Sequence, residues 1–146
     1  MSDNKDKRIG FLLERTTRLA KLSFTKAFKD LGVDITPEQW IVLDILNNNG
    51  SLSQKDIGKR SYKNAPTISR IIDNLVNKNL VSRVIHKVDR RKASIQLTDA
   101  GHQVIAQCQE EVDKIRTLSW DGLDDDDYDT FRSLLDKIFD NFESYH

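Results

Sequence analysis

Apolar residues recur every three or four positions along most of the chain, the spacing that places side chains on one face of an α-helix. This pattern predicts helices over about 6–31, 36–49, 53–60, 66–77 and 99–143, the last of them interrupted at Trp120-Asp121-Gly122. Between residues 81 and 97 the period changes to two, so apolar and polar side chains alternate as along a half-buried strand. A charged turn at 88–91 separates the two alternating runs. The pattern therefore predicts a mostly α-helical fold with one small β-hairpin.

The expected helix ends carry residues that satisfy unpaired backbone groups. Thr36 and Gln39 flank Pro37 in the arrangement of a capping box with proline at the first helical position. Gly32 follows the first helix, where a left-handed residue commonly ends a helix. Four aspartates at 124–127 open the last helix, where negative charge interacts favourably with the helix dipole. We interpret this acidic run as a helix start and not as a cation site.

The order of elements over about 36–98 is typical of a winged helix-turn-helix lobe. A short helix, a turn and a longer helix with one apolar and one polar face form the helix-turn-helix arrangement, and the hairpin that follows is the wing. The second helix of such a unit can enter the major groove of DNA, with its N-terminal residues nearest the base edges. In the helix over 66–77, the side chains expected to face DNA are Thr67, Ser69, Arg70 and Asn74.

Residue type suggests a role for several of these side chains. The planar guanidinium of Arg70 can bond guanine through two hydrogen bonds, and the amide of Asn74 can address adenine in the same way. Lys55, Lys59 and Lys63 lie on or next to the short helix, where contacts with phosphates are expected. We therefore expect specificity from the longer helix and salt-dependent affinity from these lysines.

The turn of the hairpin places Arg90, Arg91 and Lys92 at the tip of a protruding ribbon. A basic tip beside a recognition helix can enter the adjacent minor groove, where narrowing strengthens the negative potential. Lys92 is also a candidate for phosphate contact. Asp89 is expected to pair with Arg91 and to hold that side chain in position, a structural role inside the wing.

Length and charge narrow the class of protein. With 146 residues, 38% of them hydrophobic, the chain is long enough to bury a core as one domain. The net charge is zero, yet the segment from Ser53 to Asp99 holds eleven basic and four acidic residues, a local charge of +7. The two flanks together therefore carry −7. Such asymmetry is expected when one module faces phosphates and the rest of the protein does not.

Several motifs resemble the MarR family of bacterial transcriptional regulators, and the resemblance covers about residues 6–142. The most specific is the wing sequence Asp89-Arg90-Arg91 with its downstream Leu-Thr and Gly. The motifs are ITPEQW at 35–40, PTISR at 66–70, DRR at 89–91, IQLT at 95–98 and Gly101. The resemblance implies an obligate dimer that represses genes by binding a pseudo-palindrome, often relieved by a small ligand or an oxidant.

The resemblance also implies that the N- and C-terminal helices, about 6–31 and 99–143, form the dimer body around the lobe at 36–98. The residues support this independently, because the first and the last two helices each carry an apolar stripe, and the stripes of the last two have coiled-coil-like spacing. In a single-domain chain of this size, only a second copy of the chain would cover the apolar side chains of the last helix, which are Phe131, Leu135, Ile138 and Phe142.

Other candidate sites are weaker. Phe24, Phe28 and Trp40 are candidates to line an effector pocket, although plain core packing explains them more simply. Cys108 lies on an apolar stripe, whereas the peroxide-sensing branch of the family has its cysteine in the first helix, so we expect a buried, inert thiol. The histidines show no metal-ligand spacing, and no catalytic motif is present. We therefore expect no metal, no cofactor and no enzymatic activity.

Our hypothesis is a cytoplasmic, homodimeric protein that binds specific double-stranded DNA. The absence of a signal-peptide pattern and of a long apolar run favours the cytoplasm. Two alternatives stay open: a winged helix that docks a protein partner, and a small-molecule sensor without DNA binding. The basic wing tip disfavours the first, because protein-docking surfaces more often expose aromatic side chains.

Overall fold

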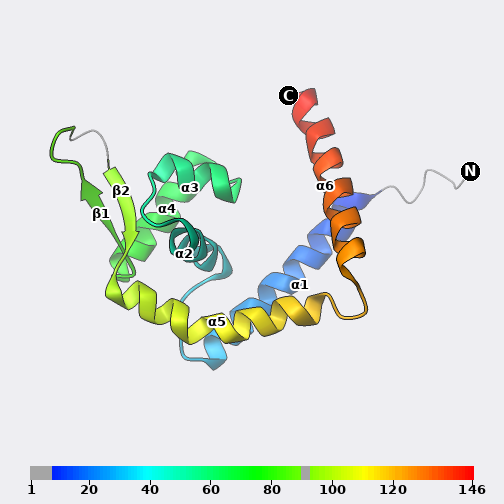
Figure 1. Cartoon of the computed structure of the whole chain (residues 1–146), viewed down its shortest axis with the longest axis horizontal. Coiled ribbons are helices and arrows are strands. Elements are labelled where there is room, and N and C mark those ends of the chain that lie inside the picture. Colours follow the sequence, from blue (N-terminus) through cyan, green and yellow to red (C-terminus); the bar gives the residue numbers. More distant parts are fainter. Residues whose placement is uncertain (1–7, 90–92) are drawn as a thin grey trace, which may run out of the picture. The chain divides into compact units, whose positions relative to one another are not determined.

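The computed structural model describes residues 8–89 and 93–146 (Figure 1). They form two compact units divided between Val112 and Asp113. The elements are α1 (Ile9–Asp30), α2 (Pro37–Asn49), α3 (Gln54–Ser61), α4 (Ala65–Asn77), β1 (Val81–Ile85), β2 (Ala93–Leu97), α5 (Asp99–Ser119) and α6 (Asp125–Tyr145). The predicted fold class, mostly α-helical with one β-hairpin, is confirmed. The predicted order of elements is also confirmed, with boundaries that differ by a few residues.

The core of the first unit is formed where α2, α3 and α4 pack against one another and against the hairpin (Figure 1). Its centre is apolar, so burial of these side chains drives the packing. The largest fully buried side chains are Phe28, Leu43, Leu46, Ile57, Ile68, Ile71, Ile72, Leu75, Ile95, Val42, Val81 and Val112.

Local hydrogen bonds at the helix ends confirm the predicted caps. The Thr36 hydroxyl accepts from the Gln39 amide, and the Gln39 side chain accepts from the Thr36 amide, both at 3.1 Å. Gly32 adopts the left-handed conformation after α1, with φ of 72°. Asp124 and Asp127 form a second capping box at the start of α6, so the acidic run is a helix start.

The hairpin is a short antiparallel sheet in which Arg83 lies opposite Ile95. Leu52, just before α3, extends this sheet by one bridge to Ile95, with N–H to O distances of 3.1 and 2.7 Å between the two backbones. The bridge attaches the wing to the segment that leads into the helix-turn-helix.

The second unit contains the end of α5 and α6. Trp120 contacts Tyr128 and Phe131, with ring centroids 5.0 and 6.1 Å apart. No residue of α6 is buried within this chain. Among the described residues, no helix has the length and apolar character needed to cross a membrane.

Candidate nucleic-acid interface

The helix α4 is held in place by its apolar face and by a polar cap at its start. Asn64 is the N-cap, and its side-chain oxygen accepts a hydrogen bond of 2.9 Å from the Thr67 amide. Pro66 follows within the first turn, where its missing N–H removes no helical hydrogen bond. Ile68, Ile71, Ile72 and Leu75 are all buried, so the opposite face of α4 is available to a partner.

The residues predicted to read DNA lie on that opposite face. Arg70 and Asn74 are exposed, while Thr67 and Ser69 are half-buried near the helix start. Arg70 and Asn74 are four positions apart, so they lie one above the other along the helix. This arrangement suits two side chains that contact neighbouring bases in one groove.

The helix α3 and the turn after it form a second part of the surface. Ser53 caps α3 by accepting from the Asp56 amide at 3.1 Å. Tyr62 ends the helix in the left-handed conformation, with φ of 56°, and its side chain is 83% exposed. The Lys63 amide then donates to the Gly58 oxygen at 3.1 Å, which folds the turn back onto α3. A bulky residue in this conformation is sterically costly, which is typical of functional turns.

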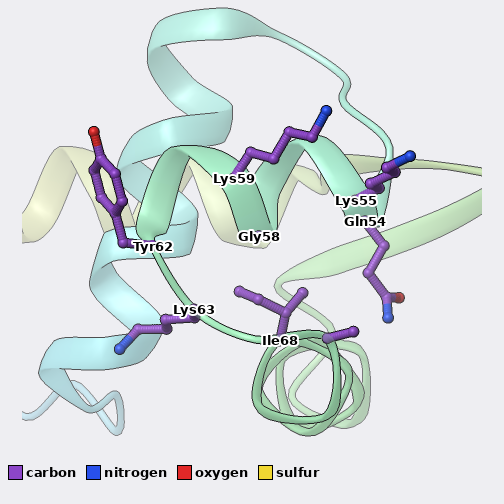
Figure 2. Close-up of a pocket in the computed structure, with 8 residues that line it drawn as sticks. Gln54, Lys55, Gly58, Lys59, Tyr62, Lys63 and Ile68 are labelled. Carbon is purple, nitrogen blue, oxygen red and sulfur yellow. The ribbon is translucent and has the colours of Figure 1, made fainter. Parts of the chain in front are cut away.

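Three of the four lysines predicted to bind phosphates, Lys55, Lys59 and Lys63, surround a shallow hollow between α3 and the start of α4 (Figure 2). Gly58 and Ile68 form part of its lining, while the ammonium groups of Lys55 and Lys63 point to opposite sides of it. Lysines that diverge in this way match phosphates spaced along a strand better than one small anion. The full lining is Gln54, Lys55, Gly58, Lys59, Tyr62, Lys63, Ala65 and Ile68.

The wing is tied to α4 as well as to the Leu52 bridge. The Arg83 guanidinium of β1 forms an ion pair with the Asp73 carboxylate of α4. Across the hairpin, a ring nitrogen of His86 lies 3.0 Å from the Ser94 hydroxyl. The ion pair connects the hairpin to α4, and the His86–Ser94 contact links the two sides of the hairpin to each other.

The predicted wing tip itself, Arg90, Arg91 and Lys92, lies outside the described residues. Asp89, which we expected to pair with Arg91, is half-buried at the edge of the described hairpin. The roles assigned to these four residues therefore stay predictions.

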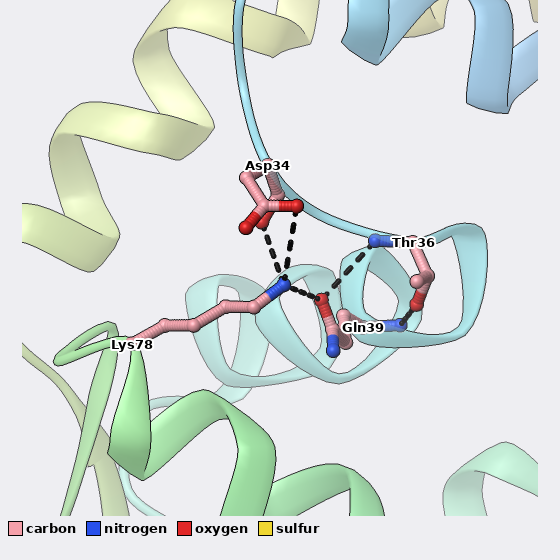
Figure 3. Close-up of polar contacts among 4 residues, drawn as sticks. All are labelled: Asp34, Thr36, Gln39 and Lys78. Atoms are coloured by element: carbon pink, nitrogen blue, oxygen red, sulfur yellow. Dashed lines mark hydrogen bonds and ion pairs between the residues drawn. The ribbon is translucent and has the colours of Figure 1, made fainter.

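At the far end of α4, Lys78 is directed toward the segment between α1 and α2 (Figure 3). Its ammonium group donates to the Asp34 backbone oxygen at 2.7 Å and to the Gln39 side-chain oxygen at 3.0 Å. Lys78 and Arg83 both belong to the segment of local charge +7. The structure commits both to contacts within the protein, and neither spacing nor residue type pointed to those partners.

The three effector-pocket candidates differ in how deeply they are buried. Phe28 and Trp40 are buried in the core, 1% and 4% exposed, with ring centroids 5.8 Å apart. Phe24 is partly buried against the same core. The buried indole N–H of Trp40 has no hydrogen-bond acceptor among the described residues. A buried donor without an acceptor is costly, so an acceptor at this position would be stabilising.

Cys108 is completely buried on α5, and burial raises the pKa of its thiol above the ordinary value. A thiol in this environment is a poor nucleophile because little of it is deprotonated. Across residues 8–89 and 93–146, no three His, Cys, Asp or Glu side chains are grouped so that they could hold a metal ion.

The curated proteins that this chain resembles are HTH-type transcriptional regulators. The MarR family model matches residues 35–93, which contain α2, α3, α4 and β1. The HTH-type transcriptional repressor IacR of Pseudomonas putida is 28% identical over 112 residues, covering 77% of this chain and 67% of IacR. Alignments with the curated relatives span 43–67% of the length of those proteins.

Solved structures share the fold over nearly the whole chain. One is BpsR of Bordetella bronchiseptica, from a study of how 6-hydroxynicotinic acid regulates its DNA binding. It is 24% identical, with a TM-score of 0.81, and the match covers 96% of this chain and 99% of that one. Another is a MarR mutant of E. coli in complex with operator DNA, also 24% identical, with a TM-score of 0.80 and coverage of 94% and 99%. The family model, the related regulators and the shared fold agree: residues 35–93 of this chain match the MarR family, and the chain has the winged-helix fold of MarR-family structures.

Proposed function

We propose that this protein is a homodimeric transcriptional repressor that binds a pseudo-palindromic DNA site. The observation that carries the proposal is the exposed polar face of α4, with Arg70 and Asn74 one helical turn apart above a fully buried apolar face. In this proposal Arg70 reads guanine and Asn74 reads adenine in the major groove, with Thr67 and Ser69 at the helix start beside them. The related IacR is a transcriptional repressor, and the E. coli MarR mutant was solved with operator DNA.

Affinity comes from the lysines around the hollow between α3 and α4. Lys55 and Lys59 are exposed and Lys63 is half-buried, and they belong to the segment of local charge +7. Each phosphate neutralised by a lysine releases counterions, so binding weakens steeply as salt rises. The wing residues Arg90, Arg91 and Lys92 add minor-groove and phosphate contacts in this proposal.

A second copy of the chain covers the apolar side chains that each unit leaves exposed. In α1, Phe11 and Leu19 are both 66% exposed, and in α6 Phe142 is 64% exposed. Large apolar side chains that recur exposed along a helix are expected to be covered by a partner. With two-fold symmetry, the two α4 helices would lie roughly 34 Å apart, one turn of DNA. The other large exposed apolar residues of α1, α5 and α6 include Leu12, Leu22, Leu118, Phe131, Leu134 and Phe139.

We further propose that a small aromatic acid relieves DNA binding. The supporting observation is the Trp40 indole N–H, which is buried without an acceptor among the described residues. Because DNA binding by the structurally similar BpsR is regulated by 6-hydroxynicotinic acid, this compound is the first to test. It should lower DNA affinity and change Trp40 emission in a Trp120→Phe variant, which leaves Trp40 as the single tryptophan.

The first experiment is fluorescence anisotropy with labelled random-sequence duplex DNA at 50 and 200 mM salt. A complex with two chains per duplex that weakens by about 10³-fold between these conditions would support the proposal, since that change corresponds to six or more phosphate contacts. Selection of bound sequences from random duplexes would then yield the operator. Absence of binding at 50 mM salt would overturn it and favour a protein-docking winged helix. A tight ligand without any DNA binding would favour a sensor.

A further inference from the structure

The C-terminal end of α4 is where the recognition helix is attached to the rest of the lobe. Lys78 is the residue after the last helical position, and its amide still donates to the Asn74 oxygen at 3.0 Å. The Asn79 amide donates to the Val76 oxygen at 2.9 Å. Since these bonds continue the helical pattern, the backbone of Lys78 moves with α4. Whatever holds the Lys78 side chain therefore holds this end of the helix.

The acceptors around the Lys78 ammonium belong to the α1–α2 connection and to the start of α2 (Figure 3). They are the Asp34 backbone oxygen at 2.7 Å, the Gln39 Oε1 at 3.0 Å and the Asp34 carboxylate at 3.7 Å. Two of these acceptors occupy two of the three N–H donors of the ammonium group, and the carboxylate at 3.7 Å adds an ion pair.

The acceptors of the two hydrogen bonds are themselves fixed, whereas the Asp34 carboxylate is 99% exposed. Gln39 is 5% exposed, and its Oε1 also accepts from the Thr36 amide at 3.1 Å as part of the capping box. Val33 and Ile35, on either side of Asp34, are buried in the core. The Lys78 ammonium therefore binds to a rigid site and not to a mobile loop.

We propose that Lys78 is a positioning residue for DNA recognition, which sets the angle of α4 by holding its C-terminal end against the start of α2. This inference rests on the proposed function, because it assigns Arg70 and Asn74 to the bases. Arg70 is eight residues before Lys78, about 12 Å along the helix axis. A tilt of about 5° at the held end would move Arg70 by about 1 Å, enough to break a well-formed hydrogen bond to a base.

The same geometry excludes Lys78 from the phosphate contacts in this proposal. Its donors face acceptors of the protein, and its side chain is only 28% exposed. Lys59, by contrast, is exposed on the rim of the hollow between α3 and α4. The two lysines are therefore a matched pair: both carry one positive charge, but only Lys59 is expected to release counterions when DNA binds.

The experiment compares Lys78→Met with Lys59→Met. It measures the dissociation constants for the selected operator and for a random duplex of equal length, each over a range of salt concentration. Lys78→Met should lower the ratio of specific to non-specific affinity by about tenfold and leave the salt dependence of random-duplex binding unchanged. Lys59→Met should weaken both duplexes equally and reduce the slope of log affinity against log salt by about one.

Variants of the partner give an independent readout. Gln39→Glu keeps acceptors for both Lys78 and the Thr36 amide, so it should retain the wild-type specificity ratio. Gln39→Met removes both and should lower the ratio as Lys78→Met does. If Lys78→Met does not fold, Lys78→Gln, whose amide keeps N–H donors, replaces it with an expected smaller loss of the same ratio.

A wild-type specificity ratio in the folded Lys78 variant would overturn the inference while leaving DNA binding by the protein intact. A reduced salt slope in Lys78→Met, equal to that of Lys59→Met, would overturn it too, because Lys78 would then be a phosphate contact. Failure of the wild-type protein to bind either duplex is a different result, since it overturns the proposed function itself.

Discussion

A Cβ atom on Gly101 would lie 2.2 Å from the backbone oxygen of Leu80. The first turn of α5 therefore lies directly against the chain that leaves α4. Thr98 secures this contact: its amide donates to the Leu80 oxygen at 3.1 Å, and its hydroxyl donates to the Asn79 oxygen at 2.6 Å. The Gly101 amide in turn donates to the Thr98 hydroxyl at 3.0 Å. The close approach explains why glycine follows the Leu-Thr pair here.

Replacing Gly101 by Ala should destabilise the protein by about 3 kcal/mol, because the backbone of Leu80 or the start of α5 must move to admit the methyl group. Urea unfolding followed by circular dichroism measures this difference. Gly10→Ala in α1 is the matched control, since a Cβ there meets nothing within 4 Å. The control should leave stability unchanged or raise it by up to about 1 kcal/mol, because alanine favours a helix more than glycine does. Equal effects of the two substitutions would contradict the steric explanation.

Periodicity and capping residues were sufficient to predict the fold, because both depend on neighbours in sequence. The buried face of α4, the Thr36–Gln39 capping box and the Asp124–Asp127 cap all follow from spacings of three or four residues. Tertiary contacts between segments far apart in sequence could not be predicted in this way. The bridge from Leu52 to Ile95 is an example, since its partners are 43 positions apart.

In the candidate site, too, features that depend on near neighbours in sequence were predicted, and contacts between distant segments were not. The exposure of Arg70 and Asn74 followed from helical geometry alone. The partners of Lys78 and Arg83 within the protein could not be predicted, because tertiary packing determines them. Their acceptors lie 44 and 10 positions away in the sequence. A count of charges along the sequence cannot separate such lysines and arginines from those that face solvent.

Replacing Arg70 by Ala should cost about 1–3 kcal/mol of binding free energy on the selected operator and relax specificity at one base pair. The reason is that a bidentate contact with guanine is lost while phosphate contacts remain. Anisotropy titrations on the operator and on single-base variants measure the effect. Lys55→Ala serves as the comparison and should weaken all these duplexes alike. An Arg70→Ala protein that binds as tightly and as selectively as wild type would disprove the assigned role.

The ion pair between Asp73 and Arg83 should influence DNA binding through the orientation of the wing. Both side chains are partly exposed, 57% and 36%, so breaking the pair should cost less than about 1 kcal/mol of stability. Asp73→Asn makes the protein more positive, and Arg83→Met makes it less positive. If the pair orients the wing, both variants should bind DNA more weakly, and the double variant no more weakly than either. Tighter binding by Asp73→Asn would instead show that charge alone matters.

Acid should weaken the contact between α1 and α2 that Lys21 and Glu38 form at 2.9 Å. The hydrogen bond from Lys21 lowers the pKa of Glu38 below its ordinary value of 4.5. Because the folded state prefers the carboxylate, this stabilisation is fully present above pH 4.5 and is lost as the pH falls through the lowered pKa. Glu38→Gln should cost at most about 0.5 kcal/mol at pH 7, since both side chains are partly exposed.

Urea unfolding of the Glu38→Gln and wild-type proteins at pH 7 and pH 3 checks this sign. The difference in stability should shrink at the lower pH and also in 1 M salt, which screens the pair. A difference that is the same at both pH values would show that the substitution acts through packing and not through charge.

Cys108 should be unreactive in the folded protein. Its side chain is 0% exposed, and burial raises the pKa of the thiol above the ordinary 9.0. Labelling by a disulfide reagent at pH 8 should therefore be at least about 100-fold slower in native protein than in urea, because labelling requires local opening. The protonated form is favoured by folding, so its contribution to stability is full below pH 9.0 and is lost as the pH rises through the raised pKa.

Cys108→Ala should bind DNA like wild type before and after peroxide treatment. Rapid labelling of the native thiol would contradict its burial, and loss of DNA binding on peroxide treatment in wild type alone would identify Cys108 as a redox sensor.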